Sequence, residues 1–285
     1  MASPSLRPSI GPGSVVIHRR HALGLFAAAS ILPSRSFANV SSQRSEFRDD
    51  LQKRFFDLGT EGTFVAYKID DYLIVASDKK RSGEGKLPAS TFKIPNSLIA
   101  LETGVVKDPD KDVFKWDGVT RPIEAWNKDH TLRSAIAVSA VPVYQEIARR
   151  IGEARMQEYV DKLDYGNRDI GGGIDQFWLS GKLRIDPIEQ IDFVDRLRRG
   201  VLPVGKRSQE LVRDILPVTK VGDATIRAKS GLTGREQGSL GWLVGWVEKG
   251  SAVTVFAMNM DCKTPEQIAA RMSVTQQCLT DIVAM

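Results

Sequence analysis

Three short polar motifs in this 285-residue chain have the residue types of a nucleophilic active site. The first is Ser90-Thr91-Phe92-Lys93, in which a lysine follows a serine by three residues. We expect this motif to open a helix, where the positive end of the helix dipole stabilises an alkoxide and a nearby oxyanion. Lys93 then lies one turn on and faces the same side as Ser90. Its chain neighbours are apolar, so burial would lower the pKa of its amine and make it a candidate general base.

The same motif also has a plainer interpretation, a serine that caps a helix beside an exposed lysine. Considered alone, the residues support both interpretations equally. A second serine–x–x–lysine, Ser77-Asp78-Lys79-Lys80, lies in a charged turn, and we interpret it as a chance occurrence.

The other two motifs supply a hydroxyl and a cation. Ser139-Ala140-Val141 follows an apolar run, and a buried serine near a helix end explains it when it is taken alone. Lys229-Ser230-Gly231 ends an expected edge strand and combines a cation, a hydroxyl and a glycine that lets a ligand approach the backbone. This set suits a substrate with a carboxylate and a carbonyl, although a polar strand end before a turn has the same composition.

The elements that must position these motifs are strands at both ends of the chain and helices between them. We expect a first helix over 46–58, a hairpin over 62–68 and 72–77, and a helix over 91–103. Further helices are expected over 143–151, 154–163, 187–199, 208–216 and 265–283, and further strands over 225–229, 242–248 and 252–259.

This order predicts an α/β (α+β) fold with one antiparallel sheet built from both chain ends, flanked by helices, and an inserted, mostly helical lobe. The sheet lobe would comprise about 45–85 and 220–285, and the helical lobe about 86–219. A site would then lie at the seam between the two lobes.

In their order, the three motifs resemble the signature of the penicillin-recognising serine enzymes. The class D, oxacillinase-type β-lactamases are the most similar, because three further segments also match their pattern. The six matching segments are Ser90-Thr91-Phe92-Lys93, Ser139-Ala140-Val141, Tyr165-Gly166-Asn167, Phe177-Trp178-Leu179, Lys229-Ser230-Gly231 and Val244-Gly245-Trp246-Val247-Glu248. The resemblance runs from about residue 45 to the end and implies the β-lactamase/DD-transpeptidase-like fold.

The resemblance also implies catalytic roles. Ser90 would attack the lactam carbonyl, and Ser139 would relay a proton to the leaving nitrogen. Lys93 would react with CO2, and the resulting carbamate would be the general base for acylation and deacylation. Only a neutral amine reacts with CO2, so this modification needs a buried lysine. Trp178 would hydrogen-bond the carbamate through its indole N–H; without the resemblance it would be assigned to the core.

For the substrate, the resemblance implies contacts from both lobes. Lys229 and Arg271 would grip the substrate carboxylate, although Arg271 alone reads as a solvated charge. The backbone N–H groups of Ser90 and Leu232 would form an oxyanion hole. The implied substrate-binding residues are Val141, Lys229, Ser230, Gly231, Leu232 and Arg271. No metal is implied, and CO2 is the only added group. The turn over 232–239, with Arg235 and Glu236, leaves the substrate preference open.

Residues 1–38 have the pattern of a signal peptide. They contain four arginines and no acid, then an apolar run over 22–32, and end in Ser36-Phe37-Ala38. The apolar run is too short to span a bilayer. We therefore expect export to the periplasm and a catalytic domain over 39–285, with Arg19-Arg20 a weak sign of twin-arginine export. A disordered tail with a chance apolar patch is the other interpretation. Cleavage would lower the formal net charge from +5 to +1, which does not favour a nucleic-acid partner.

Histidine and cysteine usage narrows the chemistry further. His130 is the only histidine after residue 38, and its polar surroundings favour a surface or capping role over catalysis. A serine–histidine–aspartate triad would have to use it, and a zinc site would find few ligands. Cys262 and Cys278 are expected before and within the last helix, too far apart to pair, so we predict two free cysteines.

Two other functions share these motifs: a β-lactam sensor that stays acylated, and a cell-wall DD-peptidase. A sensor is expected to carry transmembrane helices before this domain, whereas here only a cleavable leader precedes it. A DD-peptidase usually has asparagine where Val141 stands, and often further domains or an anchor after the equivalent of Met285. The expected partner is a small β-lactam, with no nucleic acid and no membrane after cleavage, and the protein would be a monomer or a homodimer.

Overall fold

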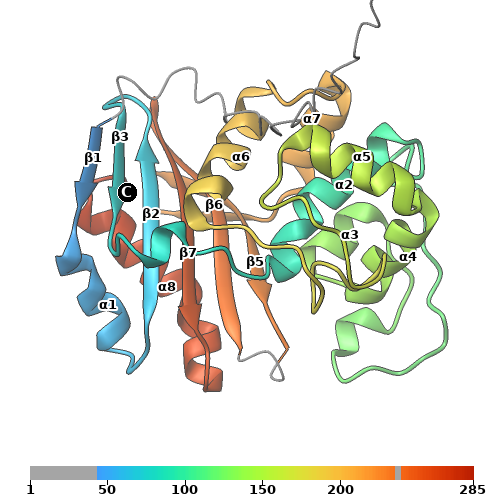
Figure 1. The fold of residues 1–285 in the computed structure, drawn as a ribbon, viewed down its shortest axis with the longest axis horizontal. Coiled ribbons are helices and arrows are strands. Elements are labelled where there is room, and N and C mark those ends of the chain that lie inside the picture. Colours follow the sequence, from blue (N-terminus) through green and yellow to red (C-terminus); the bar gives the residue numbers. More distant parts are fainter. Residues whose placement is uncertain (1–43, 235–238) are drawn as a thin grey trace, which may run out of the picture. The chain divides into compact units, whose positions relative to one another are not determined.

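The computed structural model describes residues 44–234 and 239–285 and contains a seven-stranded sheet in the order β1-β3-β2-β7-β6-β5-β4 (Figure 1). The strands are β1 (Arg44–Phe47), β2 (Gly62–Lys68), β3 (Leu73–Ala76), β4 (Val218–Val221), β5 (Ala224–Leu232), β6 (Leu240–Lys249) and β7 (Ala252–Asp261). β2 pairs with β7, so strands from the two ends of the described chain meet in the middle of the sheet. All neighbouring strands are antiparallel except β1 and β3.

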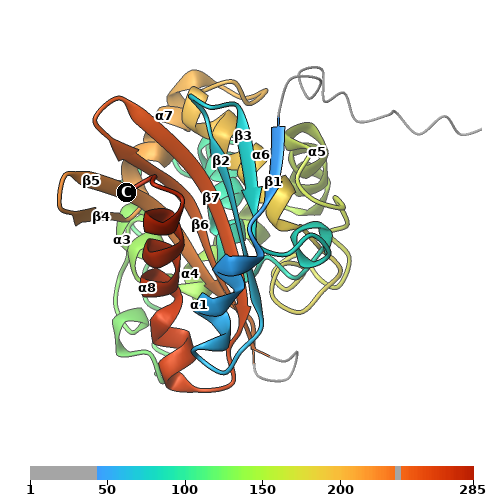
Figure 2. The same ribbon diagram turned by 90° about the vertical axis from the view of Figure 1, so that its left-hand side faces the viewer.

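Helices cover both faces of this sheet, as Figure 2 shows for α8 (Pro265–Asp281) on one face and α6 (Pro187–Arg199) on the other. The first eight residues of β6 are buried on both sides of the strand. Because both faces are covered, central strands read as nearly continuous apolar runs and not as alternating ones. The core is accordingly divided into two clusters, one with Trp242 and Val244 toward the helical side and one with Leu243 and Val247 toward α8.

The remaining helices lie mostly between β3 and β4 in the chain. They are α1 (Lys53–Phe56), α2 (Lys93–Glu102), α3 (Leu132–Ala137), α4 (Val141–Ile151), α5 (Glu153–Leu163) and α7 (Lys206–Ile215). All residues of α2 except the last are buried, and α4, α5 and α7 pack around it. A helix buried on every side holds its side chains rigidly, and α2 carries Lys93.

Local capping residues explain where α6 begins and ends. Asp186 caps α6 by accepting a hydrogen bond from the Glu189 backbone N–H, Pro187 begins the helix, and Gly200 ends it with φ 70°. Only a residue that tolerates the left-handed region terminates a helix in this way without strain. The expected helix over 187–199 is therefore confirmed residue for residue.

The predicted fold class is confirmed, but the first expected helix and the purely antiparallel sheet are wrong. The expected helix over 46–58 contains the end of β1, a single 3₁₀ turn and the four-residue α1. Residues Arg44–Phe47 pair in parallel with Leu73–Ala76, so tertiary strand pairing overrides the local helical pattern. For the same reason the sheet is mixed, where we expected a purely antiparallel one. β4, which no expectation covered, pairs with the start of β5.

His130 is almost fully buried, so the expected surface position is wrong. One ring nitrogen is 2.9 Å from the Ser134 hydroxyl and the other is 2.9 Å from the Ala125 carbonyl. Both ring nitrogens are therefore engaged in structural hydrogen bonds and not in catalysis. Thr131, the next residue, caps α3. Cys262 and Cys278 are both buried and free, as expected.

None of the helices within 44–234 and 239–285 is long and apolar enough to cross a bilayer. The expected signal peptide over 1–38 lies outside the described residues, and so do Arg235 and Glu236 of the turn before β6.

Candidate active site

Ser90 and Lys93 form the centre of the site. Ser90 lies in a 3₁₀ turn, Ala89–Phe92, and Lys93 is the first residue of α2. Lys93 Nζ is 2.7 Å from Ser90 Oγ and is fully buried. Burial, together with the positive charge of Lys229, holds the pKa of Lys93 well below its usual range. A neutral amine at this distance offers a lone pair to the serine proton, so the pair has the geometry of a nucleophile and its base.

The turn that presents Ser90 is held from outside the helix. Ala89 has φ 48°, a conformation that costs an L-residue about 1–2 kcal/mol. Its backbone N–H donates to the Trp178 carbonyl at 3.0 Å. Thr91 Oγ1 donates to the Pro88 carbonyl at 2.7 Å and accepts from Gln190 Nε2 at 2.9 Å. These contacts hold the strained turn, and the turn aims Ser90 toward the sheet.

Aromatic rings pack around the start of the helix that carries the lysine. The Tyr144 ring centroid is 5.2 Å from Lys93 Nζ, and Trp178 stacks on Phe92 with centroids 5.5 Å apart. Trp178 Nε1 is buried and has no hydrogen-bond partner among the described residues. An unsatisfied buried donor costs about 1–3 kcal/mol, so this N–H marks a place where an acceptor would be stabilised.

A second pair of cations lies across the turn, on β5 and α8. Lys229 is almost fully buried; burial and the charge of Arg271 lower its pKa to about 7. Arg271 donates from Nη1 to the Gly231 carbonyl at 2.5 Å, and burial lowers its pKa too. A Cβ on Gly241 would lie 2.7 Å from Arg271 Cδ, so β6 carries a glycine where the arginine side chain crosses it. Two partly desolvated cations side by side suit an anionic substrate group.

The end of β5 lies directly against the Ser90 turn. A Cβ on Gly231 would lie 3.1 Å from the Pro88 carbonyl and 3.2 Å from Thr91 Cγ2, so a side chain there would have to displace the Ser90 turn by a few tenths of an ångström. Thr233 N donates to the Leu240 carbonyl at 3.0 Å, toward β6, whereas Ala228 N donates to Pro217 on the opposite side. N–H groups alternate in an antiparallel strand, so the Leu232 N–H points away from β6, toward the open edge beside Ser90. An oxyanion between the Ser90 and Leu232 N–H groups would meet two donors.

Ser139 occupies the turn between α3 and α4, with φ 57° and a half-buried side chain. α4, which begins at Val141, packs on α2 through Asn96 Nδ2, which donates to the Tyr144 carbonyl at 3.3 Å, and through a 2.8 Å contact between Ser97 and the Tyr144 hydroxyl. A cavity of about 250 Å³ opens between this region and β5, with Ala137, Lys229, Ser230 and Arg271 in its walls. Ala137 ends α3 two residues before Ser139, so this cavity lies near the Ser139 turn.

The structure thus brings together most of the residues singled out from the sequence. Six of them are linked by direct contacts or by charge interactions, either with each other or with the turn that presents Ser90. They are Ser90, Lys93, Trp178, Lys229, Gly231 and Arg271. Ser139 and Val141 are placed by the turn between α3 and α4, and neither hydrogen-bonds to Ser90 within the described residues. Sequence reasoning missed Tyr144 and Gly241, because an aromatic residue on an amphipathic helix and a glycine in a strand carry no local sign of function.

The second serine–x–x–lysine motif lies away from this site. Ser77 accepts a hydrogen bond from the Phe64 N–H at 2.9 Å, and Asp78 accepts from the Lys80 and Arg81 N–H groups at 2.8 Å. The Lys80 side chain is 89% exposed, and its amine lies 3.7 Å from a Glu84 carboxylate oxygen. The interpretation of this motif as a chance occurrence is confirmed.

Comparison with known proteins adds three findings. Residues 63–284 match the family described as "Penicillin binding protein transpeptidase domain". Beta-lactamase OXA-48 of Klebsiella pneumoniae is 44% identical over 255 residues, covering 90% of this chain and 94% of its own length. Beta-lactamase OXA-10 of Pseudomonas aeruginosa is 41% identical over 252 residues, covering 87% and 94%.

Solved structures agree with the sequence matches. FUS-1 (OXA-85), a class D β-lactamase from Fusobacterium nucleatum subsp. polymorphum, superposes with a TM-score of 0.80 at 36% identity, covering 84% of this chain and all of its own. The class D β-lactamase YbXI from Nostoc gives a TM-score of 0.79 at 38% identity, covering 82% and 99%.

Proposed function

Because the chain belongs to the penicillin-binding-protein transpeptidase family and, within it, to the class D β-lactamases, we propose that it hydrolyses the amide bond of penicillin-type β-lactams through an acyl-enzyme on Ser90. The observation that carries this function is the 2.7 Å contact between Ser90 Oγ and the fully buried Lys93 amine. A serine next to a neutral base is a nucleophile at neutral pH.

The proposed reaction has two halves. In acylation, Ser90 Oγ bonds to the lactam carbonyl carbon and gives its proton to the base at Lys93. The C–N bond then breaks; Ser139 donates its proton to the ring nitrogen and takes up the proton held at Lys93, which frees the base again. In deacylation, the base at Lys93 takes a proton from a water molecule that attacks the ester, and Ser90 leaves as the alcohol. The Ser90 and Leu232 N–H groups would stabilise the oxyanion in both halves.

We also propose that the working base is a carbamate formed from Lys93 and CO2. The amine bonds to the carbon of CO2 and loses a proton, which requires a neutral lysine such as this site favours. The carbamate would bring two oxygen acceptors, and Trp178, which stacks on the chain neighbour of Lys93, has a buried Nε1–H without a partner among the described residues. The residues present therefore fit the group.

Replacing Trp178 with phenylalanine is expected to make activity dependent on added bicarbonate. The variant keeps an aromatic ring and loses the one N–H that the carbamate would use. A hydrogen bond to a charged group is worth about 1.5–3 kcal/mol, which corresponds to a roughly 10- to 100-fold weaker CO2 affinity. Hydrolysis rates measured across a bicarbonate series report this affinity.

Trp246→Phe is the matched control, because the Trp246 indole N–H donates to Glu248 on β6. Its bicarbonate dependence should equal that of the wild type. A Trp178→Phe protein with wild-type activity and no bicarbonate response would contradict the carbamate role.

The pKa of Lys229 predicts a decline of kcat/KM with alkaline pH. An ammonium is charged below its pKa and neutral above it, so Lys229 loses its charge as pH rises through about 7. Binding of a substrate carboxylate to the free enzyme weakens over the same range, and kcat/KM reports the free enzyme. Lys229→Arg should remove this decline, because a guanidinium stays charged. Equal pH profiles for both proteins would exclude Lys229 as the titrating group.

The test of the function is turnover of a chromogenic cephalosporin by the purified protein. Hydrolysis of many substrate molecules per enzyme would support a β-lactamase. Release of one product molecule per enzyme, with no further turnover, would contradict hydrolysis and favour the sensor or the DD-peptidase. A D-alanyl-D-alanine peptide, assayed in parallel, separates these two, because only the peptidase cleaves it.

Export to the periplasm, cleavage after residue 38 and a monomeric or homodimeric state complete the proposal. The arginine-rich start and apolar run of residues 1–38 support export. The N-terminal sequence of protein recovered from a periplasmic fraction would locate the cleavage point.

A further inference from the structure

One row of residues crosses the middle of the sheet on the face that meets the helical lobe. Trp242 of β6 lies opposite Gly231 of β5 on one side and Asn259 of β7 on the other. Residues opposite one another on neighbouring strands point to the same face of a sheet. Trp242 belongs to the core cluster on the helical side, so the whole row points that way. There it meets residues 81–90, the lead-in segment, which ends at the nucleophile.

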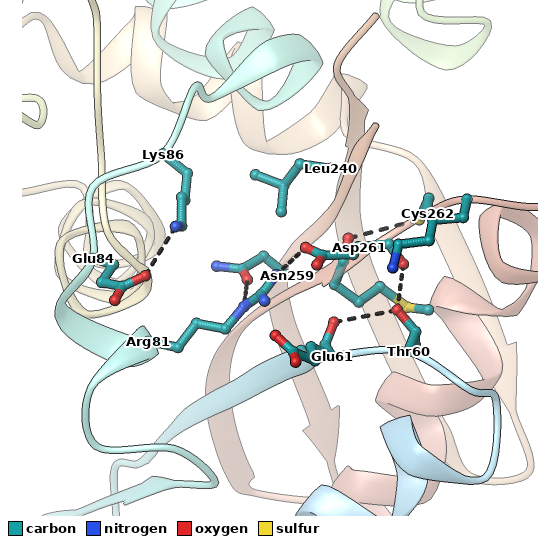
Figure 3. A network of polar contacts seen from close by, with 12 residues as sticks. Thr60, Glu61, Arg81, Glu84, Lys86, Leu240, Asn259, Asp261 and Cys262 are labelled. Atoms are coloured by element: carbon teal, nitrogen blue, oxygen red, sulfur yellow. Dashed lines mark hydrogen bonds and ion pairs between the residues drawn. The ribbon is translucent and has the colours of Figure 1, made fainter. Parts of the chain in front are cut away.

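Asn259 holds the start of the lead-in segment. Its side chain is fully buried, and Oδ1 accepts a hydrogen bond from Arg81 Nε at 2.7 Å. Arg81 also donates from Nη2 to Asp261, farther along β7, at 2.8 Å (Figure 3). Arg81 lies nine residues before Ser90. This network therefore fixes where the segment begins and leaves the position of its end to other contacts.

Trp242 holds the end of the same segment. Its ring is fully buried, and its indole N–H donates to the Leu87 carbonyl at 2.9 Å, three residues before Ser90. Among the described residues, this is the one hydrogen bond that joins the last four residues of the lead-in segment to a strand. The Ala89 N–H instead donates to Trp178, in the helical lobe. Trp242 is thus the hydrogen-bonded link from the sheet to the nucleophile turn.

The same tryptophan is paired with the strand that carries the second oxyanion donor. Its partner Gly231 is the residue before Leu232, whose N–H faces the oxyanion position. A Cβ on Gly231 would lie 3.1 Å from the Pro88 carbonyl and 3.3 Å from Trp242 Cβ. The missing side chain permits this close approach of β5 to the turn, and the bond from Trp242 to Leu87 maintains it. One residue therefore connects the segments that carry both oxyanion donors.

The turn also has a reason to move when it is released. Ala89 has φ 48°, in the left-handed region that L-residues avoid. Backbone strain of this kind persists only while the surrounding contacts impose it. Without the bond to Leu87, relaxation of the turn would carry the Ser90 N–H away from β5 and from the Leu232 N–H.

We propose that Trp242 is a positioning residue that sets the distance between the two oxyanion donors, an inference that rests on the proposed function. Because its side chain is fully buried, it reaches neither the substrate nor the reacting atoms, and it acts through the Leu87 carbonyl. Oxyanion donors stabilise charge that develops only in the transition state. Loss of the Trp242 N–H should therefore slow both acylation and deacylation and leave the binding of unreacted substrate unchanged.

The test is Trp242→Phe, which keeps an aromatic ring and loses the N–H. We expect kcat and kcat/KM to fall together by about 10- to 100-fold, because a misplacement of about 1 Å costs up to about 100-fold. KM should stay at the wild-type value, since an interaction made only in the transition state lowers both constants equally. Trp242→benzothienylalanine, which replaces the N–H by sulfur and keeps the ring shape, should give the same result without a cavity.

A spectroscopic readout reports the donors directly. In the Lys93→Met background the acyl-enzyme is expected to accumulate, and a penicillin with an isotope-labelled lactam carbonyl isolates its ester band in the infrared spectrum. Hydrogen bonds to a carbonyl oxygen weaken the C=O bond and lower its stretching frequency. The band should therefore move to higher wavenumber when Trp242→Phe is added.

Two control variants separate this role from general destabilisation. Trp246→Phe makes the same change four residues along β6, where the indole N–H donates to Glu248. Arg81→Gln loosens the start of the lead-in segment and should lower the unfolding temperature, because it removes the bonds to β7. Both controls should keep the wild-type kcat and KM, and neither should move the ester band.

Two outcomes would overturn the role of Trp242. One is wild-type kinetic constants and an unmoved band in the Trp242 variants. The other is an equal loss of kcat in Arg81→Gln, which would trace the effect to the lead-in segment as a whole. A wild-type protein that neither acylates at Ser90 nor hydrolyses a penicillin would instead overturn the proposed function itself.

Discussion

Ser90→Ala is expected to abolish turnover, with a loss of kcat/KM of at least about 10⁴-fold. The nucleophile forms the covalent intermediate, and neither the base nor the oxyanion donors can replace it. The measurement is hydrolysis of a chromogenic substrate, together with intact-protein mass after mixing with a penicillin. The wild type should show an acyl adduct at early times, and the variant none.

The control for this variant is the serine of the second serine–x–x–lysine motif. Ser77→Ala removes the acceptor for the Phe64 N–H and should lower the unfolding temperature while leaving kcat/KM close to the wild-type value. Ser90→Ala should show the opposite pattern, a normal unfolding temperature and no turnover. An adduct on the Ser90→Ala protein would place the nucleophile elsewhere.

Lys93→Ala is expected to separate the two halves of the reaction. A general base contributes about 10²- to 10⁴-fold, and in this mechanism it acts in both acylation and deacylation. Acylation should be slow and deacylation slower still, because the attacking water has no other base in the buried site. The acyl-enzyme should therefore accumulate, which mass spectrometry detects as a stable adduct on Ser90.

A second variant, Lys93→Met, keeps most of the side-chain volume, so that loss of the base is not confused with a cavity in the core. It should trap the acyl-enzyme as Lys93→Ala does. Lys80→Ala, which removes the exposed lysine of the second motif, should behave as the wild type. Rapid deacylation by Lys93→Met would show that another group activates the water.

Trapping of the acyl-enzyme also bears on the difference between an antibiotic-hydrolysing enzyme and a protein that is only inactivated. The Ser90–Lys93 pair and the oxyanion donors serve acylation in either case. What distinguishes hydrolysis is a base that remains active beside the ester, and here Lys93 is fully buried with its amine over the Tyr144 ring. Burial lowers the pKa of this amine and so favours its neutral form, and the unpartnered Trp178 N–H is the feature that a carbamate would satisfy.

Much of the fold and of the site was predictable because it depends on neighbours in the chain. The hairpin of β2 and β3, the capped helix α6 and the turn–helix that joins Ser90 to Lys93 follow from periodicity, capping residues and a three-residue spacing. The start of the expected helix over 46–58 failed because the deciding partner of Arg44–Phe47 is a strand about thirty residues later, and no local pattern contains that pairing.

The sequence by itself therefore determined which residue types carry the chemistry and in what order they occur, because side-chain chemistry and local spacing are properties of the chain. Only the tertiary structure decided the electrostatics: it buried Lys93, set Lys229 beside Arg271, turned the Leu232 N–H to the open edge of β5 and brought the Trp242 indole N–H to the Leu87 carbonyl. The pKa of an amine and the direction of a strand N–H depend on desolvation and on pairing between distant segments. Those quantities exist only once the sheet and the helices have packed together.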